Sequence, residues 1–303
     1  MNDLQKYLST CLLATAALLV GASPAWAQVS LGTASAFSVL GSPVTTTSST
    51  ITGDVGSAGA VTLTSSTING NLVYTGALTN TSSTISGTST QPLPIQVVTD
   101  FNSAYAAALA ATCTATLGAT ITGPVTLAPG VYCTGAALTG AGVLTLDAGG
   151  NANAVWIFKI GAALSGTGFS VVMANGGQPC NVFWAPGAGV TMTTWAFSGN
   201  ILAGGATGAI TLTGGPLAGR ALANGAVTMT GSSVIGCGAA AGPPYCVVPP
   251  KPSCDTNHQH HKNCKLHDYD PPHCDGNDDG WDSHWPFQSK DEHGGKDDKS
   301  GRR

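Results

Sequence analysis

The sequence predicts a mainly β protein, a solenoid of short strands with one helix alongside. Three observations predict it: a 17-residue repeat, strand-like runs separated by glycine, and a shortage of charge. The chain has 41 glycines among 303 residues and only 9% charged residues, where an average soluble protein has about a quarter. A coiled coil or long-helix protein is excluded, because such chains draw about half their residues from Ala, Glu, Lys, Leu and Arg.

The repeat gives the solenoid its period. A segment Thr-Ser-Ser-Thr-Ile-x-Gly begins at Thr47, Thr64 and Thr81, 17 residues apart each time. A looser pattern, in which an apolar residue alternates with Thr, returns near residues 189, 208 and 225. A period just under about 20 residues, with β-prone runs between glycines, is typical of a β-solenoid.

Alternation within each run assigns the two sides of each strand. In the run Val190-Thr191-Met192-Thr193 the apolar residues share one side and the threonines the other, because side chains along a strand alternate with a period of two. We expect the apolar residues to point into the coil and the threonines to point out. Asn80 departs from this pattern, since it occupies an inward position.

One segment predicts a helix. Residues 95–111 lack glycine and are rich in Ala, and Val98, Phe101, Tyr105 and Leu109 lie three or four positions apart, the spacing of one helical face. Pro94 suits a first helical turn. The sequence therefore predicts one helix over about residues 93–112, whose apolar stripe covers the flank of the solenoid.

The N-terminus has the pattern of a secretory signal peptide over residues 1–27. Lys6 precedes an apolar run at residues 11–20, and Ala25-Trp26-Ala27 is a small-residue cleavage pattern. The run is too short to span a membrane, which takes about 18 apolar residues or more. We expect the mature chain to begin near Gln28 and to lie outside the cytoplasm, as a secreted, periplasmic or cell-surface protein.

Export makes disulfides the expected state of the cysteines. Eight of the nine cysteines follow residue 27. Cys113 with Cys133 is the first choice of pairing, because that bridge would tie the end of the helix to the next strand. Cys180 with Cys237 is the second choice, and the pairing of the others stays open.

Charge is concentrated at the C-terminal end. Residues 28–250 contain only Asp54, Asp100, Asp147, Lys159 and Arg220, whereas residues 251–303 contain eight basic residues, eleven acidic residues and all seven His. A nucleic-acid binder is excluded, because this balance does not make the basic stripe that phosphate contacts require. The sequence thus predicts a body at residues 28–237, a Gly/Ala/Pro linker at 238–250 and a tail at 251–303.

Motifs of the body resemble a known family. In order, they are Leu-Gly-Thr-Ala at residues 31–34, Ile-Thr-Gly-Asp-Val-Gly at 51–56, Leu-Ala-Pro-Gly-Val-Tyr at 127–132, Val-Trp-Ile-Phe-Lys-Ile at 155–160, Asn-Val-Phe-Trp at 181–184, Gly-Asn-Ile-Leu at 199–202 and Gly-Arg-Ala-Leu-Ala at 219–223. Over about residues 31–237 the chain resembles the microbial ice-binding domain known as DUF3494. The resemblance implies a discontinuous right-handed β-helix of triangular cross-section with the helix packed alongside one face. It also implies adsorption to ice through a flat, fairly apolar, Thr-containing face.

Ice adsorption suits the outward threonines. Ice is neutral, and Thr offers a methyl and a hydroxyl group on a side chain of few rotamers. Stacked strands would repeat these groups about every 4.8 Å. Trp195, beside Thr194, would instead indicate a strand side that is not flat. The first-choice ice-binding residues are Thr191, Thr193, Thr211, Thr213, Thr228 and Thr230, and the second choice is Thr45, Thr47, Thr62, Thr64, Thr79 and Thr81.

We expect no enzymatic activity. The body has no His and its few carboxylates lie far apart in the sequence, so neither a carboxylate pair nor a nucleophile with its base is evident. Asp54 and Arg220 lie in the family motifs, where we expect them to hold turns or pair structurally. The alternative function is that of an adhesin or structural solenoid that binds polysaccharide or cell envelope, for which aromatic side chains along a groove would be the sign. Outward threonines can also form a merely solvated β surface.

The tail is rich in side chains that can bind a metal ion and poor in the apolar residues that build a core. It has few apolar residues and no periodicity, so we expect it to be disordered. With three cysteines, five histidines lie within 21 positions, a set that suits Zn or Cu: His258, His260, His261, His267 and His273. Residues 275–280 begin like a calcium loop, although Pro286 stands where the bidentate Glu would be. Metal binding through the tail is the second alternative function, whereas the body requires no cofactor.

Overall fold

The structure is a computed structural model that describes residues 29–237. The expected signal peptide, the linker and the tail with its histidines and the calcium-like loop lie outside these residues. Between residues 29 and 237, no helix is long and apolar enough to cross a membrane.

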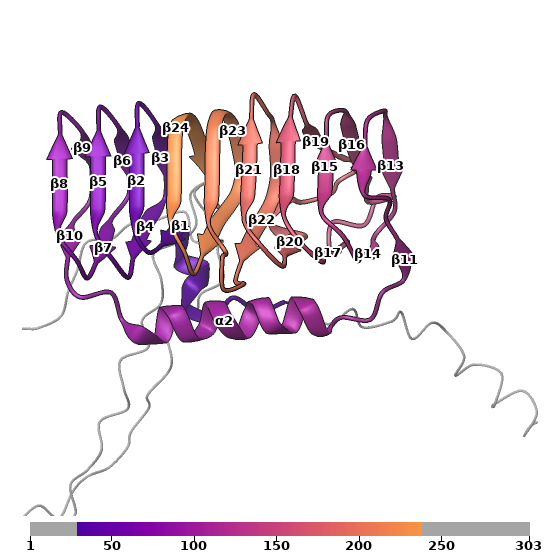
Figure 1. Ribbon diagram of the computed structural model, residues 1–303, viewed down its shortest axis with the longest axis horizontal. Coiled ribbons are helices and arrows are strands. Elements are labelled where there is room, and N and C mark those ends of the chain that lie inside the picture. The colour runs from indigo at the N-terminus through magenta and orange to yellow at the C-terminus, as the bar shows by residue number, and fades with distance from the viewer. Residues whose placement is uncertain (1–28, 238–303) are drawn as a thin grey trace, which may run out of the picture. The chain divides into compact units, whose positions relative to one another are not determined.

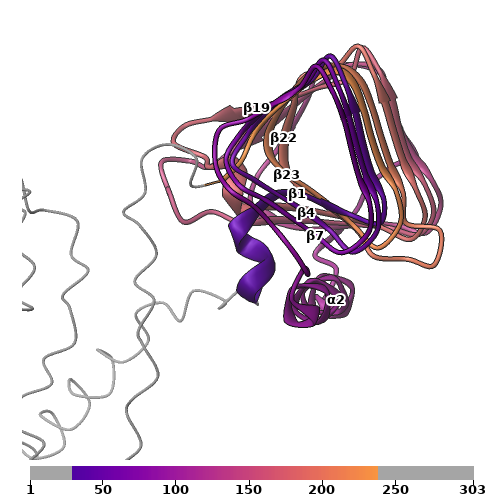
Figure 2. The ribbon, with the colours of Figure 1, turned by 90° about the vertical axis from the view of Figure 1, so that its left-hand side faces the viewer.

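The body is a coil of short parallel strands with three sides. Figure 2, which looks along the coil, shows a triangular outline. The helix α2 (Ile95–Ala110) runs along the length of the coil (Figure 1). The prediction of a mainly β chain with one α-helix beside it is confirmed, while the right-handed sense of the coil stays a prediction.

We call one side of the triangle the threonine face, after its outward residues. Nine strand segments pair in an unbroken parallel ladder along it. In order along the coil they are β8 (Leu78–Thr81), β5 (Val61–Thr64), β2 (Val44–Thr47), the first part of β24 (Val227–Ile235), the first part of β23 (Ile210–Ala223), β21 (Val190–Thr193), β18 (Leu164–Thr167), β15 (Leu138–Gly140) and β12 (Thr120–Ile121).

We call the side beneath α2 the helix face. Apolar outward residues of this side form a buried cluster with the helix. The strands are β10 (Ser89–Thr90), β7 (Leu72–Tyr74), β4 (Asp54–Ser57), β1 (Phe37–Gly41), the last part of β23, β22 (Phe197–Ala203), β20 (Val182–Pro186), β17 (Trp156–Ile160), β14 (Gly130–Thr134) and β11 (Ala115–Thr116). Two short 3-10 helices, η2 (Gly32–Ala36) and η3 (Pro179–Asn181), lie in the connections.

We call the third side the second face. Its ladder is interrupted, because β13, β16 and β19 form a separate three-stranded sheet. One isolated bridge, between Ser170 and Ala196, joins this sheet to the rest. The strands are β9 (Thr84–Ile85), β6 (Thr67–Asn69), β3 (Thr50–Thr52), residues 232–235 of β24, residues 215–218 of β23, the start of β22, β19 (Ser170–Ala174), β16 (Val143–Asp147) and β13 (Val125–Leu127).

The coil is discontinuous in sequence. Strands β1 to β10 form one end, α2 leads along the helix face, and β11 to β24 build from the other end back toward the first. The last strand, β24, lies between β23 and β2, where Val227 is the register partner of both Ile210 and Val44. Figure 1 shows this junction as the orange β24 beside the purple β2.

The helix packs on a side slightly different from the predicted stripe. Phe101 is buried as expected, but Leu109 is 38% exposed, and Ala104 and Ala108 are buried in its place. Because alanine has a small side chain, this side of α2 approaches the helix face closely. The hydroxyl of Tyr105 donates a hydrogen bond of 2.9 Å to the carbonyl oxygen of Pro186.

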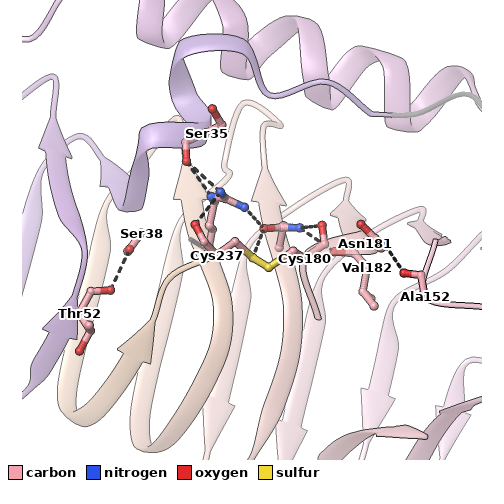
Figure 3. Close-up of a disulfide and its surroundings, with 10 residues drawn as sticks. Ser35, Ser38, Thr52, Ala152, Cys180, Asn181, Val182 and Cys237 are labelled. Atoms are coloured by element: carbon pink, nitrogen blue, oxygen red, sulfur yellow. Dashed lines mark hydrogen bonds between the residues drawn. A yellow bond between two sulfur atoms is a disulfide. The ribbon is translucent and has the colours of Figure 1, made fainter. Parts of the chain in front are cut away.

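Both chosen disulfides are confirmed. Cys113 bonds to Cys133 and so ties the segment after α2 to β14. Cys180 bonds to Cys237 and so ties η3 to the segment after β24 (Figure 3).

Asn80 occupies an inward position in the end coil, where no further coil covers it. Its side-chain oxygen accepts a hydrogen bond of 3.1 Å from the Ser83 amide. The Ser83 hydroxyl of the same coil accepts from the Ser66 amide of the next coil, and the Ser66 hydroxyl accepts from the Ser49 amide of the coil after that. Asn80 thus ends a ladder of side-chain acceptors, which explains a polar residue at an apolar position.

Candidate binding surface

All twelve predicted threonines lie on the threonine face. The first-choice and second-choice sets join where β24 meets β2, with Thr228 opposite Thr45 and Thr230 opposite Thr47. The sequence treats these sets as two candidate sites, and the structure makes them one surface.

The outward hydroxyl residues form two columns across the ladder, and neighbouring strands are about 4.8 Å apart. Every member is exposed or half-exposed. The first column is Thr79, Thr62, Thr45, Thr228, Thr211, Thr191, Ser165, Thr139 and Thr120. The second column is Thr81, Thr64, Thr47, Thr230, Thr213, Thr193 and Thr167.

Four of these residues were missed by the sequence reasoning: Thr120, Thr139, Ser165 and Thr167. The signal was present in residues 164–167 and 138–140, where polar outward residues alternate with Leu and Gly. Glycine at the second inward position obscures the pattern, because the alternation that indicates an outward threonine has an apolar side chain at that position. Phe169 fills the space that Gly140 and Gly166 leave, since a Cβ built at either glycine would meet the Phe169 side chain.

The inward residues hold the face in place. Val44, Leu63, Leu212 and Met229 are fully buried in the core, and burial of such side chains contributes about 1.5–3 kcal/mol each. The apolar-in, threonine-out prediction is confirmed for β5 and β21, whereas the second inward residue of β2 is the buried Thr46.

A tight corner ends seven of the nine strands of the threonine face. We call it the αL corner, because each coil has one residue there in the left-handed region, with φ between 47° and 63°. Its residues are Ser82, Ser65, Ser48, Gly231, Gly214, Thr194 and Gly168. The repeated turn gives successive coils the same path from the threonine face to the second face.

Trp195 does not disturb the surface. It follows Thr194 at the αL corner, turns into the coil and is only 4% exposed. The expectation that Trp195 marks an uneven side is therefore wrong, because the residue starts the next side of the triangle.

The threonine face has no charged residue. The five charged residues between positions 29 and 237 lie on α2, the helix face or the second face: Asp54, Asp100, Asp147, Lys159 and Arg220. Asp147 has a structural role in a turn. Hydrogen bonds from the Gly149 amide and the Asn175 side chain hold the pKa of its carboxyl below the ordinary value.

Asp54 and Arg220 hold connections, as expected. The Asp54 carboxylate accepts a hydrogen bond of 2.8 Å from the Asn71 amide in the next coil. The Arg220 guanidinium donates to the carbonyl oxygens of Ser35 and Cys237 at 2.9 and 3.0 Å, beside the disulfide drawn in Figure 3. The Arg220 contacts fasten segments near the two ends of the described chain to the coil.

The structure offers little for catalysis or metal binding in the part that it describes. No three His, Cys, Asp or Glu side chains come together there to hold a metal ion. A hollow of about 340 Å³ beside η3 is lined mainly by apolar and small side chains, among them Val29, Leu31 and Phe183. In residues 29–237 every aromatic side chain is buried or half-buried, so none forms an exposed platform for a sugar ring.

Known proteins are similar to the body in sequence and in architecture. The family model described as Ice-binding-like matches residues 39–235. An ice-binding protein from Nostoc sp. (strain HG1) is 41% identical over 104 residues, which are 33% of this chain and 38% of that protein. The match therefore spans less than two fifths of the length of this relative.

Two solved structures resemble the body. The ice-binding protein of the Antarctic ascomycete Antarctomyces psychrotrophicus is 30% identical, with a TM-score of 0.54 over 67% of this chain and 96% of that one. An ice-binding protein from an Antarctic biological consortium is 32% identical, with a TM-score of 0.58 over 68% of this chain and 90% of that one.

Proposed function

The chain belongs to the Ice-binding-like family, and we propose that it is a secreted, non-enzymatic protein that adsorbs to ice through its threonine face. One observation carries the proposal: an unbroken nine-strand ladder holds two columns of outward hydroxyl residues in register, with no charge among them. The relatives named above support ice as the partner, since each of them is an ice-binding protein.

The chemistry of the face fits a neutral crystal. A charged side chain keeps a strong hydration shell, which must be lost or accommodated when a surface meets ice. Threonine offers a hydroxyl for hydrogen bonding and a methyl group that orders water, and its β-branch restricts the rotamers. A grid of such groups with a repeat of about 4.8 Å along the coil can order water in a fixed pattern before freezing joins it to the crystal. A protein held in this way inhibits further growth or recrystallisation.

The other two sides are poorer candidates for this role. The helix face is covered by α2. The second face has an interrupted ladder and exposes Val143, Val172 and Ile235, so its outward groups do not form continuous columns. The absence of exposed aromatic side chains over residues 29–237 favours ice over the polysaccharide-binding alternative.

Substitution of Thr211 tests the proposal. Thr211 lies near the centre of the first column, so Thr211→Lys or Thr211→Tyr should abolish thermal hysteresis and ice-recrystallisation inhibition while leaving the fold intact. Thr67→Lys is the matched control, because Thr67 is a half-exposed outward threonine on the second face. Circular dichroism should report the same fold in all variants.

The same two variants also test whether the ice-binding site lies on the second face. Full activity in Thr211→Lys combined with loss in Thr67→Lys would transfer the site to the second face. Inactivity of the unsubstituted chain would exclude ice binding and favour the adhesive function.

We further propose that ice binding needs no metal and that the chain acts outside the cytoplasm. Two disulfides within residues 29–237 support an oxidising location. Deletion of residues 251–303 should leave ice activity unchanged, and so should a chelator added to the full chain. Loss of activity in both experiments would instead assign the function to metal bound by the tail.

A further inference from the structure

Thr194 stands apart at the αL corner. The other six corner residues are Ser or Gly, whereas Thr194 is β-branched and has a φ of 51°. A β-branched residue at positive φ is a genuine outlier, because its side chain crowds the backbone in the left-handed region. The corner therefore has its least suitable residue in the coil of β21.

The surrounding structure imposes this conformation. The Thr194 amide donates a hydrogen bond of 2.9 Å to the Thr213 carbonyl, and the Trp195 amide donates one of 3.2 Å to the Gly214 carbonyl. Burial of Trp195 anchors the turn from the inner side. The backbone is thus held by the neighbouring coil and cannot relax to suit threonine.

The Thr194 side chain brings no packing in return. It is exposed, and its hydrogen bonds within the described residues are made by its backbone. A Cβ built at the equivalent corner positions Gly168, Gly214 and Gly231 would meet nothing within 4 Å. A side chain at this corner therefore projects into solvent, with no neighbouring atom beside its Cβ.

The position of Thr194 suggests what it is for. It directly follows Thr193 of the second column, so it lies at the rim where the threonine face turns into the second face. Strained residues that bring no stability are expected at functional positions. We infer that Thr194 is a further ice-contacting residue, which extends the threonine face around the αL corner at a cost to stability. This inference rests on the proposed function.

The variant Thr194→Asn separates binding from stability. Asn adopts the left-handed region readily, so the melting temperature of the full chain should rise by about 2–4 °C. Ice-recrystallisation inhibition and thermal hysteresis should fall at matched protein concentration, because the methyl group at the rim is lost. A stabilised variant that binds ice less well is not expected of a purely structural residue.

Thr50→Asn provides the control, since it removes an exposed threonine from the second face and should leave ice activity unchanged. Ice activity in Thr194→Asn equal to that of the unsubstituted chain would overturn the inference and leave the proposed function standing. A fall in melting temperature would also overturn it, because the residue would then stabilise the turn. An inactive unsubstituted chain would overturn both proposals together.

Discussion

At the scale of the residue, threonine is found both outside and inside the coil at neighbouring positions of β2. Thr45 and Thr47 point outward into the two columns, while Thr46 between them is fully buried. Its register partners are the apolar Leu63 and Met229. Within the described residues its hydroxyl has no hydrogen-bond partner. A buried hydroxyl without a partner costs about 1–3 kcal/mol.

Thr46→Val should therefore stabilise the fold by about 1 kcal/mol, because valine has nearly the same shape and no polar atom to desolvate. The expected rise in melting temperature is about 2–4 °C. Thermal or urea unfolding measures it, with the outward Thr45→Val as the comparison. A lower melting temperature for Thr46→Val would show that the buried hydroxyl is hydrogen-bonded.

At the scale of the element, α2 is fastened to the coil at both ends. Near its start, the Asp100 carboxylate accepts hydrogen bonds of 2.7 Å from both the amide and the hydroxyl of Thr33 in η2. Just beyond its end, the Lys159 amine donates 2.8 Å to the Ala111 carbonyl. These contacts fix the helix that spans the two parts of the discontinuous coil.

The contact of Asp100 should make stability depend on pH. The amide of Thr33, then its hydroxyl and the Gln96 side chain, hold the pKa of the Asp100 carboxyl below its ordinary value. A group whose pKa is lower in the folded state stabilises the fold above the unfolded pKa, and this contribution is lost as pH falls through the folded value. The stability of the chain should therefore decline as the pH drops below the ordinary range of aspartate.

Asp100→Asn should lower stability at neutral pH and flatten this decline, because the amide has no charge to lose. Urea midpoints between neutral and acid pH measure both effects. Part of the decline should remain, since the pKa of Asp147 is also lowered. Curves for the variant and the unsubstituted chain that run parallel would contradict the role given to Asp100.

At the scale of the whole molecule, the threonine face is complete only because β11 to β24 run back along the coil until β24 pairs with β2. Thr62 on β5 and Thr211 on β23 are far apart in sequence, yet only β2 and β24 separate their strands. A crystal plane can meet both residues at once because they stand in one column. The full width of the grid exists only when both ends of the discontinuous coil are assembled.

Thr62→Lys should consequently reduce ice activity about as strongly as Thr211→Lys, since either lysine places a charge on the same plane. Thermal hysteresis of the two single variants and of the double variant tests this expectation. If each single variant kept full activity and only the double variant lost it, the two threonine sets would be separate sites.

Much of the body could be predicted from sequence because its signals are local. The two-residue alternation placed Val190 and Met192 inside and Thr191 and Thr193 outside, and the glycine-free segment gave the helix to within two residues of its bounds. The spacing of cysteines relative to the helix gave Cys113 with Cys133. The alternation and the helix follow from the steric preferences of a few consecutive residues, and the disulfide follows from the position of Cys113 at the end of that helix.

The tertiary structure alone decided which coil lies beside which. No local pattern could show that β24 pairs with β2, that Ala104 and not Leu109 meets the helix face, or that Trp195 turns inward at the αL corner. Parallel strands choose their partners through contacts between distant parts of the chain. A sequence pattern thus determined the outward threonines of each strand, and the long-range packing of coils made them one surface.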